Sequence, residues 1–358
     1  MAVPTPAEAA SGALLDRRYR LDELLSEAEG MRLWRGADTL VGELPVAIRA
    51  WWGLTDEELA ALQQRLERLK AVLHPQIPRL GAQLPAEGGC WQVREWIHGR
   101  TYQDLLQARQ ERQLVFGSGE VLLLLRQLLP ALAALHGQNL VHGDLTPANL
   151  VRRDSDGLPV LIDFGLQAAV VGQPLTAATA GYAPPQARHE PYGLWMDLYS
   201  LGVVALVLLS GEEPAALMDP VSLAWRWPEG IDLDAAFRQV LERLLATSPE
   251  QRFHSAAEVA EALTALPVPE STGPVSRSDR TAVLLPQLKP EQPAEASPAP
   301  APTRPTRDER RRAKEQAAEG RFWPVVIALL LAALVGSALG WLLLGRNRQS
   351  NRPAAARA

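Results

Sequence analysis

The middle of the chain reads His142-Gly143-Asp144-Leu145-Thr146-Pro147-Ala148-Asn149, and fourteen residues after Asn149 it continues with Asp163-Phe164-Gly165. An aspartate can accept the proton of a hydroxyl group or orient it. Asparagine and aspartate oxygens are hard ligands of the kind that Mg²⁺ prefers. The stretch therefore predicts a site for magnesium and phosphate chemistry, in which Asp144 orients a hydroxyl group while Asn149 and Asp163 bind the metal.

Composition limits the classes of protein to which the chain can belong. The 358 residues are 47% hydrophobic, which is ample for a core, and a formal net charge of −5 gives no sign of a nucleic-acid partner. A single cysteine, Cys90, excludes an intrachain disulfide framework and fits a reducing cytosol. Residues 1–15 lack the basic start and apolar core of a signal peptide, so we expect residues 1–18 to be a disordered lead-in.

Residues 19–266 have the composition of a globular domain. Alternating apolar residues around 46–48 predict a strand. Apolar residues at helical spacing predict three helices, at residues 57–73, 119–136 and 198–209. At about twelve residues, the last of these is too short to cross a bilayer, and we expect it to be buried in the domain.

A membrane helix is predicted after this domain. Residues 267–321 are rich in proline and alanine and then in basic residues, which predicts an extended linker and a juxtamembrane segment. Residues 322–345 contain no charged residue, and a helix from Trp323 to Leu344 would be about 33 Å long at 1.5 Å per residue, enough to cross a bilayer. Because only a short tail, 346–358, follows in the sequence, we expect a tail-anchored, single-pass protein.

The residues in and beside this helix predict its orientation and a contact face. Seven basic residues lie in the segment before the helix and four lie after it, which favours the cytoplasm for the domain at 19–266. Gly336 and Gly340 have the small-xxx-small spacing that lets two membrane helices approach closely. A homodimer through this face is one expectation, and chance spacing in a helix rich in alanine and glycine is the alternative.

Six more landmarks lie in order along the domain. They are Val46-Ala47-Ile48-Arg49, His74-Pro75-Gln76-Ile77, Glu95-Trp96-Ile97, Gly181-Tyr182-Ala183-Pro184-Pro185, Asp197-Leu198-Tyr199-Ser200-Leu201-Gly202 and Ser248-Pro249-Glu250-Gln251-Arg252. Together with H-x-D-L-x-P-x-N and D-F-G, they resemble the motifs of bacterial Hanks-type serine/threonine protein kinases anchored by one membrane helix. The resemblance implies an α+β, two-lobed protein-kinase-like fold. Its small lobe, 19–95, would be a mostly antiparallel sheet with one helix, and its large lobe, 98–266, would be mainly helical.

The resemblance also implies that ATP and Mg²⁺ bind between the lobes and that the substrate is a serine or threonine of a protein. By position, Leu33, Ala47 and Val151 would lie against the adenine. The backbones of Glu95 and Ile97 would form hydrogen bonds with its edge.

Two basic positions are altered around the retained Asp144, Asn149 and Asp163. Thr146 occupies the position of a lysine that would bind the γ-phosphate, and it is a candidate catalytic residue. Arg49 replaces the lysine of the strand and keeps its charge but not its compact shape. Arg49 is therefore a candidate nucleotide-binding residue.

Other positions also depart from the family pattern. The phosphate-covering loop aligns with residues 26–33 and has none of its three glycines, although the backbone there must approach phosphates closely. Gly143 replaces the arginine that would bind a phosphorylated activation loop, and Pro185 replaces the glutamate that would pair with Arg252. Arg94 occupies the gatekeeper position, beside the expected adenine pocket.

The partner of Arg49 on the small-lobe helix is left open by the sequence. Arg65 lies near the expected place of a glutamate and would repel Arg49, whereas Glu67 would attract it. Thr179 aligns with the threonine that faces the catalytic aspartate, although an ordinary loop threonine is the alternative.

Three functions remain open on these observations. The first is a weakened kinase that transfers phosphate from Mg-ATP to proteins. The second is a pseudokinase that binds a docking partner as a membrane-tethered module, with or without nucleotide. The third is a scaffold that binds no nucleotide, and it would show no thermal shift with Mg-ATP.

Overall fold

The computed structural model describes residues 4–164, 179, 181–188, 190, 193–227, 231, 233–246, 248–267 and 275–276. The chain divides into two compact units, residues 1–285 and 286–358, and all the described residues belong to the first. The predicted membrane helix at 322–345, its flanks and most of the predicted linker lie outside the described residues.

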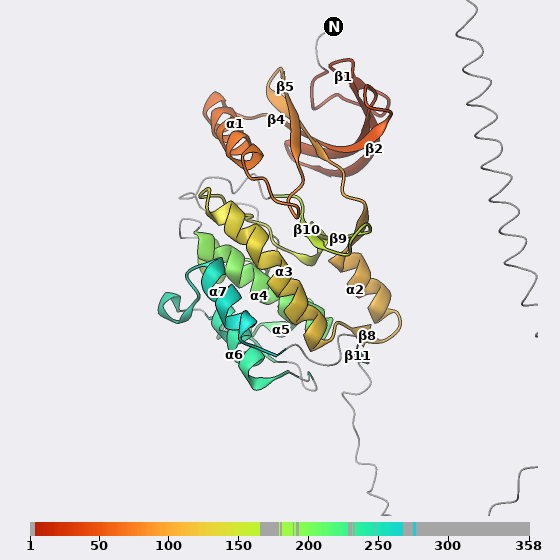
Figure 1. Ribbon diagram of the computed structural model, residues 1–358. Helices are drawn as coiled ribbons and strands as arrows, with labels where there is room; N and C mark the ends of the chain where they lie inside the picture. The colour runs from red at the N-terminus through yellow and green to blue at the C-terminus, as the bar shows by residue number, and fades with distance from the viewer. Residues whose placement is uncertain are drawn as a thin grey trace, which may run out of the picture. The chain divides into compact units, whose positions relative to one another are not determined.

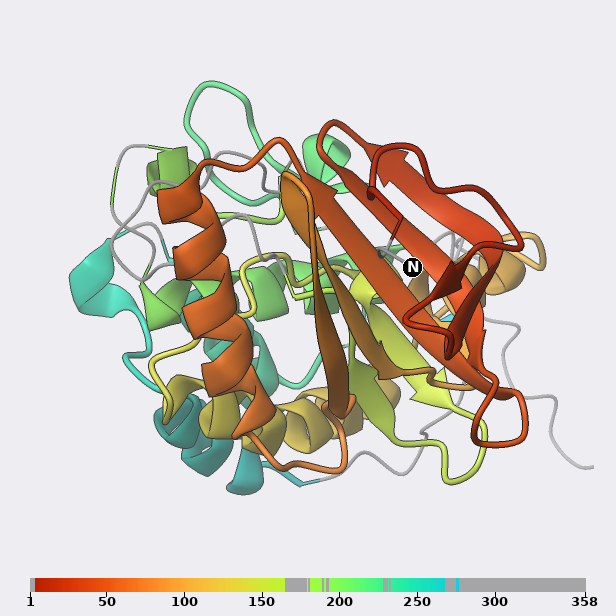
Figure 2. The same cartoon turned by 90° about the horizontal axis from the view of Figure 1, so that it is seen from above.

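A six-stranded antiparallel sheet with the strand order β1-β2-β3-β4-β6-β5 forms the small lobe (Figure 1). Its strands are β1 (Leu14–Leu15), β2 (Tyr19–Ala28), β3 (Met31–Asp38), β4 (Leu44–Trp52), β5 (Leu80–Ala86) and β6 (Gly89–Glu95). Helix α1 (Asp56–Lys70) runs beside the sheet (Figure 2) and begins at a capping box made by Thr55 and Glu58. The helix predicted at 57–73 is therefore confirmed, except that it ends before Leu73.

The two faces of this sheet have different surroundings, because alternate residues of a strand point to opposite faces. On one face Ile48 of β4 and Trp91 of β6 belong to a buried apolar cluster. On the other face, Trp51 packs in a cluster with Leu62 and Leu66 of α1. By the same alternation, Arg49 of β4 and Arg94 of β6 belong to this second face.

The first face is covered by the segment that precedes β2, so the prediction of a disordered lead-in over 1–18 is wrong for residues 4–18. Strand β1 pairs with β2, and Leu15 is fully buried. Ala9 is buried in the same cluster, and the indole N–H of Trp91 donates to the backbone oxygen of Pro4 at 3.1 Å. The physical reason is that the sheet exposes an apolar face that must be removed from water. The small lobe therefore begins well before residue 19.

The large lobe is mainly helical (Figure 1). Its helices are α2 (Tyr102–Gln110), α3 (Ser118–His136), α4 (Leu194–Ser210), α5 (Pro214–Leu217), α6 (Ala235–Leu244) and α7 (Ala256–Thr264), with short 3-10 turns η1 (Pro147–Asn149), η3 (Pro185–Arg188) and η4 (Pro249–Gln251). Its short strands are β7 (Gly99–Thr101), β8 (Leu114–Val115), β9 (Leu150–Arg153), β10 (Pro159–Leu161) and β11 (Val275–Ser276), paired in the orders β10-β9-β7 and β11-β8.

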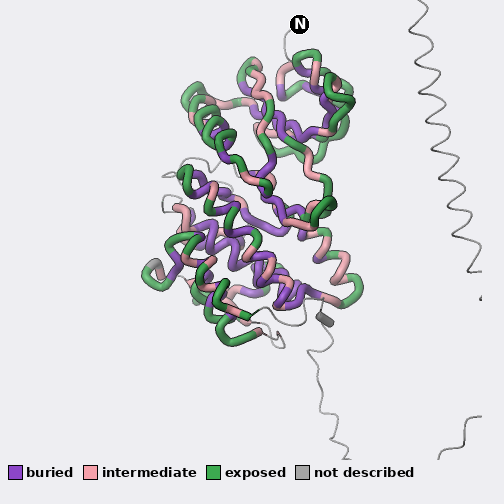
Figure 3. The backbone as a smooth tube through the Cα atoms, viewed as in Figure 1, coloured by how far each residue is buried: buried purple, intermediate pink, exposed green. Residues whose placement is uncertain are grey.

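Helices α3 and α4 form the core of this lobe and match the helices predicted at 119–136 and 198–209. Every residue of α4 from Met196 to Ser210 is buried, and Figure 3 shows that buried residues gather in the interior of this lobe. Helix α3 is long and apolar enough to cross a membrane, but 56% of its apolar window is buried within the protein. Both helices therefore owe their apolar sequences to the core.

Cys90 gives a first testable prediction, because its side chain is 5% exposed and burial raises its pKa to about 11. At pH 8 the thiolate fraction would then be about one in a thousand, and thiol reagents act on the thiolate. We expect iodoacetamide to alkylate the native chain at least about a hundredfold more slowly than the urea-unfolded chain. Mass spectrometry of timed samples would measure both rates. Equal rates would show that Cys90 is accessible in the native state.

Candidate active site

Asp144 lies at the centre of a small hydrogen-bonded group. The hydroxyl of Thr179 donates to Asp144 Oδ1 at 2.6 Å. The side-chain Nδ2 of Asn149 donates to Asp144 Oδ2 at 2.9 Å and to the backbone oxygen of Asp144 at 2.8 Å. The turn η1 sets this spacing, and the buried Thr146 immediately precedes it. The contact predicted between Thr179 and the aspartate is thus present, in a geometry that can orient a hydroxyl group.

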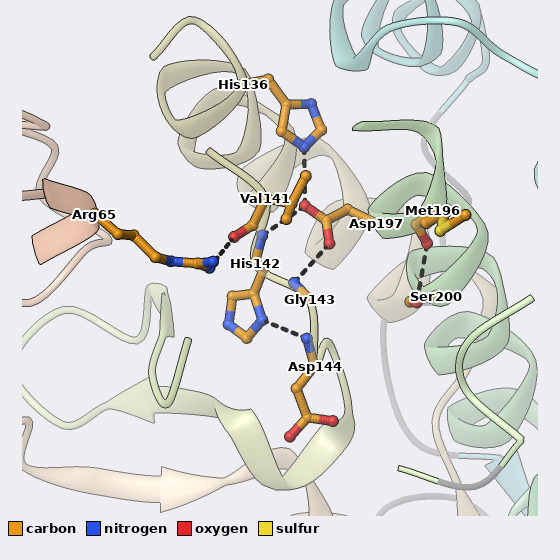
Figure 4. A network of polar contacts seen from close by, with 9 residues as sticks. All are labelled: Arg65, His136, Val141, His142, Gly143, Asp144, Met196, Asp197 and Ser200. Carbon is orange, nitrogen blue, oxygen red and sulfur yellow. Dashed lines mark hydrogen bonds and ion pairs between the residues drawn. The ribbon is translucent and has the colours of Figure 1, made fainter. Parts of the chain in front are cut away.

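The loop that carries Asp144 is held by Asp197, the first acidic residue of α4, which lies beside it (Figure 4). Its carboxylate accepts the backbone N–H of His142 at 2.7 Å and that of Gly143 at 2.9 Å, and it lies 3.0 Å from Nε2 of His136. Burial would raise the pKa of Asp197, but the contacts with His136 and with the backbone N–H of Gly143 outweigh it and hold the pKa below its ordinary value. The imidazole of His142 also packs against Phe164, with ring centroids 4.9 Å apart. The loop is therefore rigid and well supported.

Arg65 of α1 connects the small-lobe helix to the same loop, and this settles one of the alternatives left open by the sequence. Its Nη2 donates to the backbone oxygen of Val141 at 2.9 Å, and the residue is buried (Figure 4). Glu67 is exposed and lies 3.5 Å from the side-chain nitrogen of Gln83. Among the described contacts, neither Arg65 nor Glu67 pairs with Arg49.

Arg49 instead forms an ion pair with Asp163, in the D-F-G turn. Nη2 of Arg49 lies 2.8 Å from Oδ1 of Asp163, and Nη2 of Arg94 contacts the same oxygen. Both arginine side chains are 9% exposed and the aspartate side chain is 22% exposed. Asp163 has a backbone φ of 55°, a conformation rarely adopted by residues other than glycine. Two buried cations and one carboxylate thus form a compact cluster at the expected metal position.

The strand register explains why the two arginines meet. Arg49 of β4 is paired with Gln92 of β6, and Arg94 is two residues further along β6. Diagonal neighbours on one face of an antiparallel pair lie about 7–8 Å apart at Cα, which long side chains can bridge. The sequence indicated the motif position of each arginine. It did not show that the two arginines are close together, because this depends on the pairing register of β4 and β6.

The charges in this cluster follow from burial and proximity. Burial lowers the pKa of Arg49 and the neighbouring Arg94 lowers it further, although Asp163 and Asp144 oppose this. An arginine nevertheless stays protonated in a protein. For Asp163, burial would raise the pKa, but Arg94 and Arg49 outweigh it and the pKa is lowered. All three side chains are therefore charged at neutral pH, and together they carry one excess positive charge.

A bound magnesium ion does not fit this arrangement. Mg²⁺ requires near-octahedral oxygen ligands and keeps several waters, whereas Oδ1 of Asp163 already forms ion pairs with two guanidinium groups. Even two unit charges about 4 Å apart repel by about 4 kcal/mol at an effective dielectric constant of 20. Within the described part of the chain, no group of three or more His, Cys, Asp or Glu side chains could hold a metal. Asn149 and Asp163 thus remain metal ligands by prediction only.

The residues expected around an adenine come from β3, β4, the connection between the lobes and, for Val151, strand β9 of the large lobe. Leu33 is paired with Arg49 across β3 and β4, and Ala47 is on the same face as Arg49. Glu95 is exposed, and its backbone N–H donates to the oxygen of Arg79 at 2.9 Å. The other residues are buried or half-buried: Leu33, Ala47, Val151 and Ile97.

The missing glycines have a visible result at the tip of β2 and β3. The ladder continues to the pair Ala28–Met31, so residues 29–30 alone form the turn. Gly30, the second residue of this turn, has a φ of 72°, a conformation that glycine adopts readily. A tight hairpin of this kind offers little free backbone to enclose phosphates.

Arg252 contacts an aromatic ring and a backbone oxygen in place of the glutamate expected at position 185. Its guanidinium lies 3.9 Å from the ring centroid of Trp195 and donates to the backbone oxygen of Ala246. Pro185 is the residue that stands where the partner acid was expected. A guanidinium group over the face of a tryptophan ring is attracted by the ring. Trp195 was not predicted from the sequence because its distance from Arg252 depends on the fold.

The chain belongs to the protein kinase domain family, which it matches over residues 54–263. It is 34% identical over 221 residues to serine/threonine-protein kinase PknA of Nostoc sp., covering 56% of this chain and 38% of that one. It is 32% identical over 275 residues to serine/threonine-protein kinase C of Synechocystis sp., covering 70% and 50%. The kinase domain of Mycobacterium tuberculosis PknI has the same fold, with a TM-score of 0.56, 24% identity, and coverage of 72% of this chain and 98% of that one.

These comparisons confirm the α+β protein-kinase-like fold and the family to which the chain belongs. Members of the family in general use ATP and a divalent metal. The chain spans only 38% and 50% of the length of the two named relatives. The family match begins after β4, so it excludes both the tight β2–β3 turn and Arg49, which are among the positions where the sequence departs from the family pattern.

Proposed function

We propose that the chain is a pseudokinase: a kinase-like regulatory module that binds a partner protein and does not transfer phosphate efficiently. The observation that carries this proposal is the position of Arg49 and Arg94 on Asp163. Phosphoryl transfer depends on positioning and on neutralisation of phosphate charge by metal ions. A carboxylate engaged by two guanidinium groups is poorly available to a metal.

Other features support the same proposal. The tight β2–β3 turn leaves little backbone to hold the γ-phosphate in place. Arg65 links α1 to the catalytic loop through Val141, so the position of α1 does not depend on an ion pair with Arg49. The protein therefore has a kinase-shaped surface that is stable without the usual nucleotide contacts, as a docking module requires.

A second candidate function, weak serine/threonine phosphotransfer, is favoured by one specific observation. Asp144 keeps hydrogen bonds to Thr179 and Asn149 in a geometry suited to a substrate hydroxyl group. The carboxylate could accept the proton of a serine or threonine as its oxygen attacks the γ-phosphorus. The rate would be low, because removing one electrostatic contact of a transferring group costs about a hundredfold or more.

We further propose that the module is held at a membrane by a helix over residues 322–345, with the kinase-like domain in the cytoplasm. The sequence supports this through the absence of charged residues in that segment and through the excess of basic residues before it. Gly336 and Gly340 support a homodimer through the helix. The partners proposed are accordingly a protein and the lipid bilayer, and not a nucleic acid.

Transfer of labelled γ-phosphate separates the two candidate functions. We expect the unmodified chain and an Asp144→Asn variant to label a generic protein substrate, or themselves, equally and at background, since the pseudokinase proposal assigns no proton transfer to Asp144. Both proteins would be assayed at equal concentration, with thermal melting to show that each is folded. A tenfold or larger loss of labelling in the variant, about 1.4 kcal/mol in barrier height, would establish weak kinase activity instead.

A further inference from the structure

The cluster of Arg49, Arg94 and Asp163 contains more positive charge than it neutralises, with two guanidinium groups for one carboxylate. The Nε of Arg49 has no hydrogen-bond acceptor among the described residues, although the residue is only 7% exposed. A buried, charged donor without an acceptor is costly. This donor therefore indicates a ligand that accepts hydrogen bonds and carries negative charge.

The geometry points to a metal-free polyphosphate site. We propose that Arg49 and Arg94 take the place of the divalent cation, so that the cleft binds the phosphates of a nucleotide without Mg²⁺. This inference rests on the proposed pseudokinase function, since it uses the same cleft and adds the chemistry of its ligand. A guanidinium group offers five N–H donors in a planar fork, so each arginine can contact a phosphate while it still contacts Asp163.

Neighbouring groups do not supply a competing source of positive charge. Burial lowers the pKa of His142, so its imidazole is neutral at neutral pH. Gln92, between the two arginines on β6, is neutral, and its side-chain nitrogen donates to the backbone oxygen of Val93. Asp144 is the other nearby acid, and it is engaged by Thr179 and Asn149. The excess charge thus resides on Arg49 and Arg94.

The two arginines have little space beside them into which they could withdraw. The small cavity that both of them line has a volume of only about 10 Å³, about enough for one water molecule. Its lining also includes Gln92 and apolar side chains of α1, β5 and the D-F-G turn, which are Leu66, Leu69, Leu80 and Phe164. This cavity is therefore too small to receive a guanidinium group that leaves Asp163.

Nucleotide binding in EDTA and in millimolar MgCl₂ tests this inference on the unmodified full chain in detergent. A fluorescent ATP analogue is the probe, and its anisotropy gives the dissociation constant Kd under each condition. We expect metal-free binding that Mg²⁺ leaves within about twofold or weakens, because the cation position is already filled by guanidinium groups. Tighter binding by tenfold or more in Mg²⁺ would overturn the inference, and so would the absence of binding under both conditions.

An Arg94→Met variant tests the role of the second guanidinium. We expect its metal-free Kd to rise about tenfold, as for loss of one charge-assisted hydrogen bond, and its binding to become tighter when Mg²⁺ is added. Arg226→Met is the matched control, because Arg226 makes the same kind of pair with Asp219 at 2.8 Å on the exposed surface of the large lobe. Equal Kd values for the two variants in EDTA would refute the role of Arg94.

The two proposals can fail separately. Phosphate transfer that depends on Asp144 would remove the pseudokinase function, whatever the effect of Mg²⁺ on binding. A requirement for Mg²⁺ without transfer would remove only the metal-free site. If Arg94→Met were too unstable to purify, the comparison of EDTA and MgCl₂ on the unmodified chain would still decide the inference.

Discussion

Replacing Asp163 with asparagine is expected to lower the free energy of unfolding by about 3 kcal/mol, because it leaves two buried guanidinium groups without a counter-charge. The substitution is nearly isosteric, so packing should be little changed. Arg49 and Arg94 would then face each other across a neutral amide, with side chains that are each 9% exposed. Urea unfolding followed by circular dichroism measures the loss.

The double variant Asp163→Asn with Arg94→Met provides the essential comparison. If the loss comes from uncompensated charge, removing one arginine should recover about half of it, a coupling of about 1–2 kcal/mol between contacting residues. Asp156→Asn is the matched control, since Asp156 pairs with Arg153 at 2.6 Å on the surface and its loss should cost much less than that of Asp163. A stability of Asp163→Asn equal to that of Asp156→Asn would mean that the arginines do not depend on Asp163 in the folded protein.

This result would bear on both proposals, because it measures how firmly the arginines occupy the cation position. A metal-binding carboxylate is a source of repulsion in the metal-free protein, and removing its charge would be neutral or stabilising. The sign of the change in stability therefore distinguishes a carboxylate that serves the fold from one that awaits a metal ion.

Much of the architecture could be predicted because it depends on short-range patterns. Leucines at helical spacing located α1 and α3 to within a few residues. The fixed spacing from Asp144 to Asn149 allowed the catalytic loop to be located, because one turn, η1, carries both ends of it. In these cases the residues that determine the structure are neighbours in sequence.

The contacts that decide function were not predicted because they join distant segments. Arg94 and Asp163 are 69 residues apart, and the register of β4 and β6 places Arg94 near Arg49. Arg65 and Val141 are 76 residues apart. The packing of residues 4–18 was missed for a similar reason, because the burial of Ala9 and Leu15 is explained only by the apolar face of the sheet that they cover.

The second large effect is expected at Asp197, where substitution by alanine should lower the free energy of unfolding by about 3–5 kcal/mol. The carboxylate is completely buried and accepts the backbone N–H groups of His142 and Gly143. Alanine would leave both donors without an acceptor in the interior, and each such loss costs about 1–3 kcal/mol. The control is Asp219→Ala, because Asp219 also accepts two backbone N–H groups, from Val221 and Ser222, but in an exposed loop. A loss at Asp197 no larger than that at Asp219 would contradict the bracing role.

The pH dependence of this variant provides an independent check of the same contact. The folded-state pKa of Asp197 is lowered, so its contribution is fully present above the pKa of about 4 of an unfolded aspartate. That contribution is lost as pH falls from about 4 through the lower folded pKa, because the folded carboxylate then takes up a proton. Stability measured from pH 7 down to acid should therefore fall less steeply in Asp197→Ala than in the unmodified chain, and the two curves should converge at low pH. Parallel curves would show that the carboxylate contributes through its shape and not through its charge.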